Sequence, residues 1–371
     1  MTDLLAFTAS LVDIPSVSHN ERAVADHLQS LLAPVPWLAL TRLGDTLVAR
    51  TEAGRSQRLV LAGHTDTVPP NGNETARVDG DVCWGLGSAD MKAGVAVLAE
   101  LARTVAEPAV DVTYVFYECE EVDSRFNGLE RLFAERPDLV AGDAAVLAEP
   151  TGARIEAGCQ GTMRIEVVLT GERAHSARPW LGRNAVHRLA PVLAAVAGWE
   201  GRRVTLDGCD FREALQAVVV SGGVAANVVP DRAVLTLNHR FAPDRTPEAA
   251  EAFVRSLVGD VDGFEVVDVA PAAPPALGHG LLTALARATG APPRAKLGWT
   301  DVARFATRGV PATNFGPGDP NLAHSAGERV ERHELETVHR VLRTLLDHGV
   351  EEHGVEERHG AEEAADPPGK L

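Results

Sequence analysis

Acidic side chains and histidines follow several short apolar runs of this 371-residue chain. Histidine nitrogen and carboxylate oxygen are the ligands that zinc, cobalt and manganese accept in catalytic sites. The set therefore predicts a two-metal hydrolase, in which most members bind a pair of divalent cations and one moves a proton. The residues concerned are His64, Asp66, Asp90, Glu120, Glu121, Glu149 and His324.

Three apolar runs, at 59–63, 112–117 and 144–148, each end just before residues of this set. Helix-like segments, such as the one at 92–105, alternate with these runs. Strands buried on both faces have this composition, so the sequence predicts an α/β fold with a mostly parallel sheet covered by helices. In such sheets ligands bind beyond the carboxyl ends of the strands, and we expect the candidate residues to meet there. Any one of them alone is more often structural, so joint placement carries the prediction.

The middle of the chain has a different pattern, with the order strand, helix, strand, strand, helix, strand. This βαββαβ order is that of a smaller, ferredoxin-like α+β domain. We therefore expect a discontinuous catalytic domain of residues 1–159 and 272–350, interrupted by an inserted domain of residues 160–271. The charged, Pro-containing stretch at 351–371 lacks apolar periodicity and is expected to be a disordered acidic tail.

A helix-start signal lies near the N-terminus. Ser18 and Glu21 have the spacing of a capping box, and Val24, Leu28 and Leu31 then recur on one helical face. The pattern predicts an amphipathic helix preceded by a Ser18–Glu21 cap.

The composition excludes several classes of function. With 35 basic and 52 acidic residues, a net charge of −17 disfavours binding to nucleic acid or an anionic membrane. No apolar run has membrane-spanning length and the first residues lack a secretory signal, so the expected location is the cytoplasm. The four cysteines are scattered without a C-x-x-C pair, which argues against a disulfide scaffold and a thiolate zinc site.

These residues also resemble a known family, the M20 dinuclear zinc amidohydrolases and peptidases. The resemblance lies in the His-x-Asp motif at 64–66, the glycine-rich turn at 85–94, the Glu120–Glu121 pair, Glu149 before a proline, and the late His324. It covers nearly all of the chain before the tail. The family also commonly has a cis peptide after the aspartate that corresponds to Asp90.

The resemblance implies two divalent cations per subunit, Zn²⁺ foremost and Co²⁺ as the alternative. His64, Asp90 and Glu149 would hold one cation, and Asp90, Glu121 and His324 the other. Asp90 would therefore bridge the pair.

Three further residues are expected to act in catalysis. Glu120 would be the general base that takes a proton from water and delivers it to the leaving amine. Asp66 would accept the second imidazole N–H of His64 and fix its tautomer. By resemblance, His175 would polarise the scissile carbonyl, often in the partner subunit's site. A lone loop histidine is otherwise more often merely solvated.

The substrate side is expected on the insertion and on a late loop. Arg178, Asn227 and Arg240 are predicted to cluster on the insertion, where guanidinium groups fit carboxylates, although each arginine could instead serve a structural ion pair. Thr300 could donate to a carboxylate, while Trp299 stands where the resemblance leads us to expect small residues.

The resemblance, together with the arginines, implies an N-acyl amino acid with free carboxylates as the substrate, and it implies a homodimer in which the insertion is both lid and dimer contact. Another N-acyl amino acid hydrolase or a dipeptidase is the enzymatic alternative. A metal-free amino-acid-binding relative is the non-enzymatic one, and it predicts missing ligands.

Overall fold

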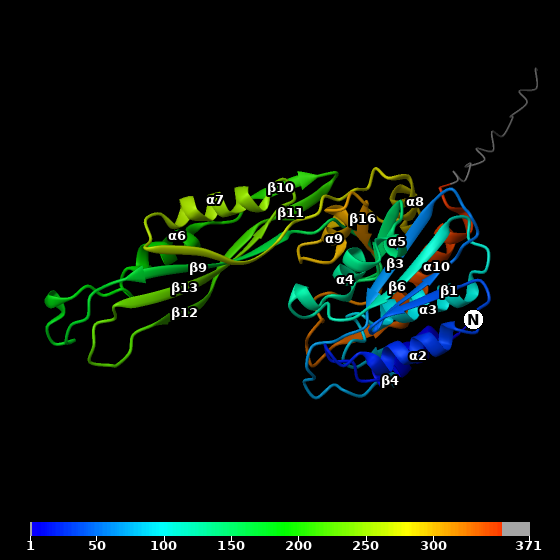
Figure 1. The fold of residues 1–371 in the computed structure, drawn as a ribbon, viewed down its shortest axis with the longest axis horizontal. Helices are drawn as coiled ribbons and strands as arrows, with labels where there is room; N and C mark the ends of the chain where they lie inside the picture. Colours follow the sequence, from blue (N-terminus) through cyan, green and yellow to red (C-terminus); the bar gives the residue numbers. More distant parts are fainter. Residues whose placement is uncertain (1, 351–371) are drawn as a thin grey trace, which may run out of the picture.

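Residues 2–350 are described by the computed structural model of the chain (Figure 1). They form a broad α/β body and an elongated body that projects from it. The acidic tail expected at 351–371 lies outside the described residues. Among the described residues, no helix combines the length and apolar character needed to cross a bilayer.

The broad body is built on an eight-stranded sheet with the order β1-β2-β6-β3-β7-β16-β8-β15. Strands β6, β3, β7 and β16 are parallel neighbours, and antiparallel pairing begins at the two edges of this central group, with β2–β6 and β1–β2 on one side and β16–β8 on the other. The predicted α/β class with a mostly parallel sheet is confirmed. The strand bounds are β1 Ala39–Leu43, β2 Thr46–Arg50, β3 Arg58–His64, β6 Asp111–Tyr117, β7 Ala144–Leu147, β8 Glu156–Ala157, β15 Arg294–Ala295 and β16 Ala312–Asn314.

Helices cover both faces of this sheet. Successive residues of β3 alternate between two apolar layers: Leu59 and Leu61 lie in one core, Val60 and Ala62 in the other. Burial on both faces explains why the sequence of this strand is a continuous apolar run. The first layer contains α1 (Leu4–Val12), α2 (Arg22–Leu32), α3 (Lys92–Thr104), α8 (Gly280–Thr289) and α10 (Arg332–His348), and the second contains α4 (Gly128–Glu135), α5 (Pro137–Val140) and α9 (Val302–Ala306).

A small antiparallel sheet brings a late segment of the chain beside the glycine-rich turn. In it β17 (Arg329–Glu331) pairs with β5 (Val82–Trp84), which also pairs with β4 (Arg77–Asp79). The loop before β17, which carries His324, therefore lies near the turn that carries Asp90.

The elongated body contains an antiparallel sheet with the order β12-β13-β9-β14 and two helices packed on it. The observed order of its main elements is βαββαβ, as predicted, whereas the ferredoxin-like assignment and the domain boundaries stay predictions. The bounds are β9 Gly161–Thr170, α6 Leu189–Gly198, β12 Ala214–Gly222, β13 Arg232–Phe241, α7 Pro247–Val258 and β14 Gly263–Ala270.

A hairpin between α6 and β12 was not expected from the sequence. Its strands are β10 (Arg203–Leu206) and β11 (Cys209–Arg212), and Figure 1 shows it reaching back towards the broad body. Phe211 is fully buried in the same apolar cluster as α8. The insertion is thus attached to the broad body at the hairpin as well as at its two chain connections. Two 3₁₀ turns, η1 (Ser124–Phe126) and η2 (Pro179–Leu181), complete the elements.

The amphipathic helix predicted after Glu21 is present as α2, but its predicted cap is wrong. Helix α2 begins at Arg22, and Glu21 at its N-cap position makes no side-chain capping hydrogen bond. Instead the Ser18 hydroxyl donates to Asp66, and the Glu21 carboxylate accepts from Cys119, far along the chain. Long-range contacts therefore replace the local cap.

Candidate active site

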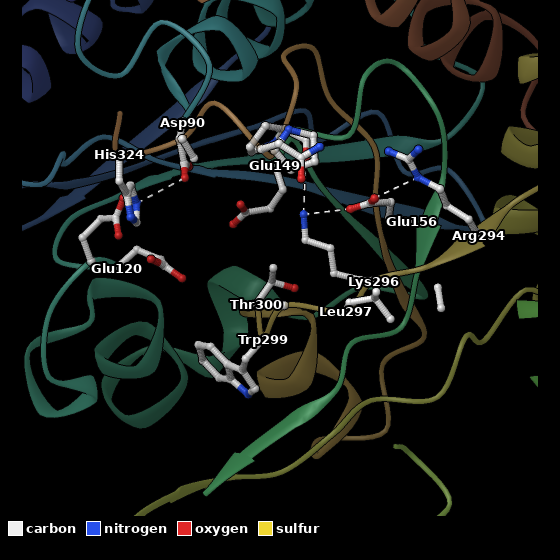
Figure 2. A pocket seen from close by; sticks show the side chains of 17 residues that line it. Asp90, Glu120, Glu149, Glu156, Arg294, Lys296, Leu297, Trp299, Thr300 and His324 are labelled. Atoms are coloured by element: carbon white, nitrogen blue, oxygen red, sulfur yellow. Dashed lines mark hydrogen bonds and ion pairs between the residues drawn. The ribbon is translucent and has the colours of Figure 1, made fainter. Parts of the chain in front are cut away.

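The predicted acids and histidines meet at the carboxyl edge of the large sheet. His64 ends β3, Glu120 and Glu121 follow β6, and Glu149 follows β7. Figure 2 shows Asp90, Glu120, Glu149 and His324 around one open cavity of about 560 Å³. Parallel neighbouring strands explain this convergence, since their carboxyl ends share one edge.

Asp90 lies between two histidines. Its Oδ1 is 3.0 Å from His64 Nε2, and its Oδ2 is 3.5 Å from His324 Nε2. The His324 Nε2 atom also lies 2.8 Å from Glu121 Oε1. Ligand-type atoms of His64, Asp90 and Glu121 all lie within 4.8 Å of one another. This arrangement leaves each oxygen of Asp90 facing a different histidine.

Glu149 provides an independent sign that a cation belongs here. Its side chain is buried and lines the same cavity, and its Oε1 atom has no hydrogen-bond partner. An unsatisfied buried polar atom costs about 1–3 kcal/mol, which a bound cation would offset. The nitrogen and oxygen donors present therefore fit a divalent metal.

The local electrostatics favour positive charge. Burial disfavours the charged form of His64, but the carboxylates of Asp66 and Asp90 outweigh it and raise the pKa of His64. Hydrogen bonds with Asp90 and Glu121 raise the pKa of His324 to about 10. Burial opposes ionisation of Asp90, yet hydrogen bonds from the two histidines hold its pKa below the usual value. The negative charge of Asp90 and its neighbours thus favours positive charge here, which either protonated histidines or bound cations could supply.

Glu149 and Glu120 both have raised pKa values. Burial, followed by the charge of Asp90, raises the pKa of Glu149 to about 7. Burial also raises the pKa of Glu120 well above its ordinary value, and the carboxylates of Asp301, Glu149 and Glu121 add to the effect. A carboxylate with a raised pKa is able to take up and release a proton near neutral pH.

Asp66 holds the turn that carries the two glutamates. Its Oδ1 accepts from Glu120 N at 3.0 Å, and its Oδ2 accepts from Glu121 N at 3.1 Å and from Ser18 Oγ at 2.7 Å. Its Oδ1 also lies 3.4 Å from His64 Nδ1. The sequence predicts the proximity of Asp66 to His64, whereas its hydrogen bonds to the Glu120–Glu121 turn are visible only in the structure.

Glu328 is a further residue of the site, one that the sequence did not predict. It is buried, and one carboxylate oxygen accepts from both Ala89 N and Asp90 N at 3.0 Å. It therefore fixes the backbone from which Asp90 projects. The peptide bond between Asp90 and Met91 is cis, as the resemblance implied. In the sequence, the one signal for Glu328 is its position four residues after His324.

A second wall of the cavity is cationic and was also missed. Lys296 Nζ lies 2.9 Å from Glu156 Oε2 and donates to the carbonyl oxygen of Pro150, while Arg294 Nε donates to Glu156 Oε1 at 2.9 Å (Figure 2). These residues lie on or beside β8 and β15, strands of two residues each that leave no sequence pattern. Two cations share one carboxylate, so this wall carries net positive charge.

Two of the predicted substrate residues lie at the cleft. Thr300 lines the cavity, and its hydroxyl donates to Asn314 Oδ1 at 2.9 Å. Arg240 lines an adjoining hollow of about 1040 Å³, which shares Glu120, Glu121 and Trp299 with the cavity. Arg240 is partly buried, which lowers its pKa, and its Nε donates to Asn238 Oδ1 at 3.2 Å.

The other two, Arg178 and Asn227, lie with the predicted catalytic residue His175 on exposed loops of the insertion. Arg178 N donates to His175 O at 2.7 Å, and Ser176 N donates to Asn227 O at 2.9 Å. None of His175, Arg178 and Asn227 lines the cavity or the adjoining hollow formed by the described residues. The expectation that Arg240 clusters with Arg178 and Asn227 is therefore wrong within one chain, because Arg240 lies at the opposite end of β13.

A sheet edge that carries histidine and carboxylate donors around an open cleft is typical of a metal-dependent α/β hydrolase. Sequence comparison specifies the class further, since the profile described as peptidase family M20/M25/M40 matches residues 60–348. This chain belongs to that family and is a hydrolase of amide bonds.

Closer relatives match almost the whole chain. A Mycobacterium tuberculosis (strain CDC 1551 / Oshkosh) protein, provisionally named succinyl-diaminopimelate desuccinylase DapE, is 51% identical over 330 residues, covering 88% of this chain and 93% of that protein. The succinyl-diaminopimelate desuccinylase of Corynebacterium glutamicum is 44% identical over 354 residues, covering 93% and 96% respectively.

Solved structures share the fold at low sequence identity. Aminopeptidase PepT from Bacillus cereus gives a TM-score of 0.76 at 18% identity, covering 93% of this chain and 97% of that one. An M20 family metallo-carboxypeptidase from Sulfolobus solfataricus gives 0.73 at 16% identity, covering 94% and 99%.

Proposed function

We propose that this chain is a metal-dependent succinyl-diaminopimelate desuccinylase, which hydrolyses N-succinyl-LL-2,6-diaminopimelate to succinate and diaminopimelate on the route to lysine. The observation that carries the proposal is the 51% and 44% identity to relatives with that name, over 88% or more of this chain. The segments FGPGDPNLAHSAGE and GWTDVARFA, which contribute His324 and Thr300, support the same choice.

Two divalent cations, most readily Zn²⁺ and alternatively Co²⁺, would occupy the cluster around Asp90. His64, Asp90 and Glu149 are proposed to hold one and Asp90, Glu121 and His324 the other, which agrees with the two-sided contacts of Asp90. Bound there, the cations would polarise the amide carbonyl and lower the pKa of water.

Glu120 is proposed as the general base. Its carboxylate lies where the cavity and the adjoining hollow meet, and its pKa is raised by burial. It would accept a proton from the attacking water and then donate that proton to the departing amine nitrogen. Asp66 assists by holding the Glu120 backbone N–H, so that the carboxylate stays directed into the cavity.

The cationic parts of the cleft suit a substrate with several carboxylates. Arg240 lines the adjoining hollow and has no carboxylate partner among the described residues. Arg294 and Lys296 line the cavity, which meets this hollow at Glu120 and Trp299. Guanidinium groups bind carboxylates through paired N–H donors. Thr300 is proposed to donate its hydroxyl to a substrate carboxylate, in place of the hydrogen bond that it donates to Asn314 here. An anionic substrate is therefore favoured inside a protein of net charge −17.

A homodimer through the inserted domain of residues 160–271 is also proposed. Edge strand β12 exposes Val218, Val219 and Val220 at 53%, 57% and 54%, and Trp180 on the same body is 75% exposed. An open apolar edge strand is suited to pairing with a second chain. The exposed His175, Arg178 and Asn227 would then serve the partner's cleft, where the His175 imidazole would polarise the scissile carbonyl.

The deciding experiment uses metal-depleted protein reconstituted with Zn²⁺ or Co²⁺. Turnover would be compared on N-succinyl-LL-diaminopimelate, N-acetylornithine and simple dipeptides. Preference for the succinylated substrate supports the proposal, and preference for another substrate would indicate an acetylornithine deacetylase, another N-acyl amino acid hydrolase or a dipeptidase. Stoichiometric amino-acid binding without metal or turnover would indicate the non-enzymatic relative.

The four cysteines are buried and form no disulfide, which favours a cytoplasmic location.

A further inference from the structure

Glu21 is a buried carboxylate without a cationic partner. It is 1% exposed, and within residues 2–350 no lysine, arginine or histidine forms an ion pair with it. The side chain does not cap α2, because the N-cap makes no side-chain hydrogen bond. Burying a charge is costly unless hydrogen bonds compensate, so the partners of Glu21 identify its role.

Two of those contacts come from Cys119, on the turn just before the candidate base. Glu21 Oε1 accepts from Cys119 N at 3.1 Å, from Cys119 Sγ at 3.3 Å and from His19 N at 3.0 Å. The next two N–H groups of the turn, those of Glu120 and Glu121, donate to Asp66. Three consecutive backbone N–H groups are therefore held by two buried carboxylates.

The backbone at both ends of this contact needs such support. Cys119 and His19 have φ values of 58° and 75°, in the left-handed region that non-glycine residues seldom adopt. Both donate their N–H groups to the same oxygen of Glu21, and Cys119 Sγ lies 3.4 Å from His19 Nδ1. Unusual backbone conformations persist only where the surroundings fix them, and they are frequent beside active sites.

The segment that supplies Glu21 is itself tied to the strand end that supplies Asp66. The Ser18 hydroxyl donates to Asp66 Oδ2 at 2.7 Å, and the Ser16 hydroxyl donates to Thr65 O at 2.7 Å. Backbone hydrogen bonds from Ser18 N to Thr67 O and from Thr67 N to Ser16 O complete the connection. The two carboxylates are thus fixed relative to each other.

We infer that Glu21 is a positioning residue, which fixes the Cys119 amide so that the Glu120 carboxylate enters the cavity in one orientation. The inference rests on the proposed role of Glu120 as general base. Because small misplacement of a catalytic group costs rate rather than substrate affinity, loss of Glu21 is expected to act on kcat.

The test compares Glu21→Ala with a matched control, Asp111→Ala. Asp111 is also buried and accepts from two backbone N–H groups, those of Ala53 and Arg55, but it lies at the opposite end of β6. In Glu21→Ala, kcat should fall about 10- to 100-fold with KM changed less than about threefold. Asp111→Ala should lose thermal stability but keep kcat. Glu21→Gln, which keeps the acceptor oxygen, should recover most of the turnover.

Amide hydrogen exchange of the metal-free protein gives a readout that needs neither substrate nor cation. Exchange across residues 117–122 should be faster in Glu21→Ala and unchanged in Asp111→Ala. Unchanged exchange there, or a kcat equal to that of the control, would overturn the inference. If wild-type protein fails to hydrolyse the succinylated substrate, the proposed function fails, and the exchange result still decides whether Glu21 holds the turn. Should Glu21→Ala not fold, Glu21→Asp, which withdraws the carboxylate by one methylene, carries the same expectations.

Discussion

One carboxylate oxygen of Glu328 accepts the backbone N–H of Asp90 at 3.0 Å, so a residue from the late part of the chain fixes the proposed bridging ligand. The same oxygen accepts from Ala89, and both contacts follow from the pairing of β17 with β5. Groups that orient metal ligands contribute measurably to the affinity for the metal.

Replacing Glu328 should therefore weaken metal binding. We expect Glu328→Ala to lower the affinity for Zn²⁺ about 10- to 100-fold, because the Asp90 backbone loses its acceptor. Competition with a chromophoric chelator would measure the change. Glu336→Ala, which alters an exposed acid of α10, is the control and should bind metal as wild type does. Equal affinities for the two variants would exclude this role of Glu328.

Glu120→Gln should separate metal binding from turnover. The proposed base lies outside the proposed ligand set, so elemental analysis should find wild-type metal content. The kcat should fall about 10²- to 10⁴-fold, the usual contribution of a general base. A variant that keeps full activity would remove Glu120 from that role.

Glu156 and Lys296 should differ in their effect on stability. Glu156 pairs with both Lys296 and Arg294, so Glu156→Gln leaves two cations uncompensated, whereas Lys296→Met leaves Glu156 with Arg294. Breaking a buried pair costs about 3–5 kcal/mol, and we expect Glu156→Gln to approach that range while Lys296→Met costs less. Urea unfolding of the metal-free protein would give the free energies. A larger loss of unfolding free energy in Lys296→Met than in Glu156→Gln would show that Arg294 does not compensate Glu156.

Most of the proposed metal ligands could be predicted from sequence because they follow apolar runs that form neighbouring parallel strands. His64, Glu121 and Glu149 need only the knowledge that β3, β6 and β7 end at one edge. His324 lies in a loop without a strand signal, and only the family resemblance assigned it to a particular cation.

The supporting residues could not be predicted, for a physical reason. Glu21 and Glu328 act on backbone N–H groups roughly a hundred or more positions away, and a backbone N–H has no residue type to recognise. Ser18 and Glu21 even carry a convincing local signal for a different role. Lys296 and Glu156 come together through two-residue strands, too short for any periodicity.

The insertion should lose stability in mild acid through His239. Burial lowers the pKa of this histidine, whose Nδ1 contacts Ala214 O while Nε2 has no partner. Because the unfolded chain takes up the proton more readily, stability is full above a pH of about 6.5 and falls as pH drops towards the lowered pKa, by at most about 1.4 kcal/mol per pH unit. Urea unfolding at pH 7.5 and 5.5 should show a smaller loss for His239→Gln than for wild type. Equal losses would assign the acid sensitivity to other groups.

Mixed dimers would test whether each cleft uses a residue of the partner. His175→Ala and Glu120→Gln should each be nearly inactive alone, since the first removes the proposed carbonyl donor and the second the proposed base. After the two variants are unfolded together and refolded, half of the dimers are mixed, and one of the two clefts in each combines an intact Glu120 with an intact His175. Activity should therefore return to about a quarter of the wild-type value. The control mixes His175→Ala with His175→Ala/Glu120→Gln, which cannot form an intact cleft and should stay inactive. A first mixture as inactive as this control would place the action of His175 outside the partner's cleft.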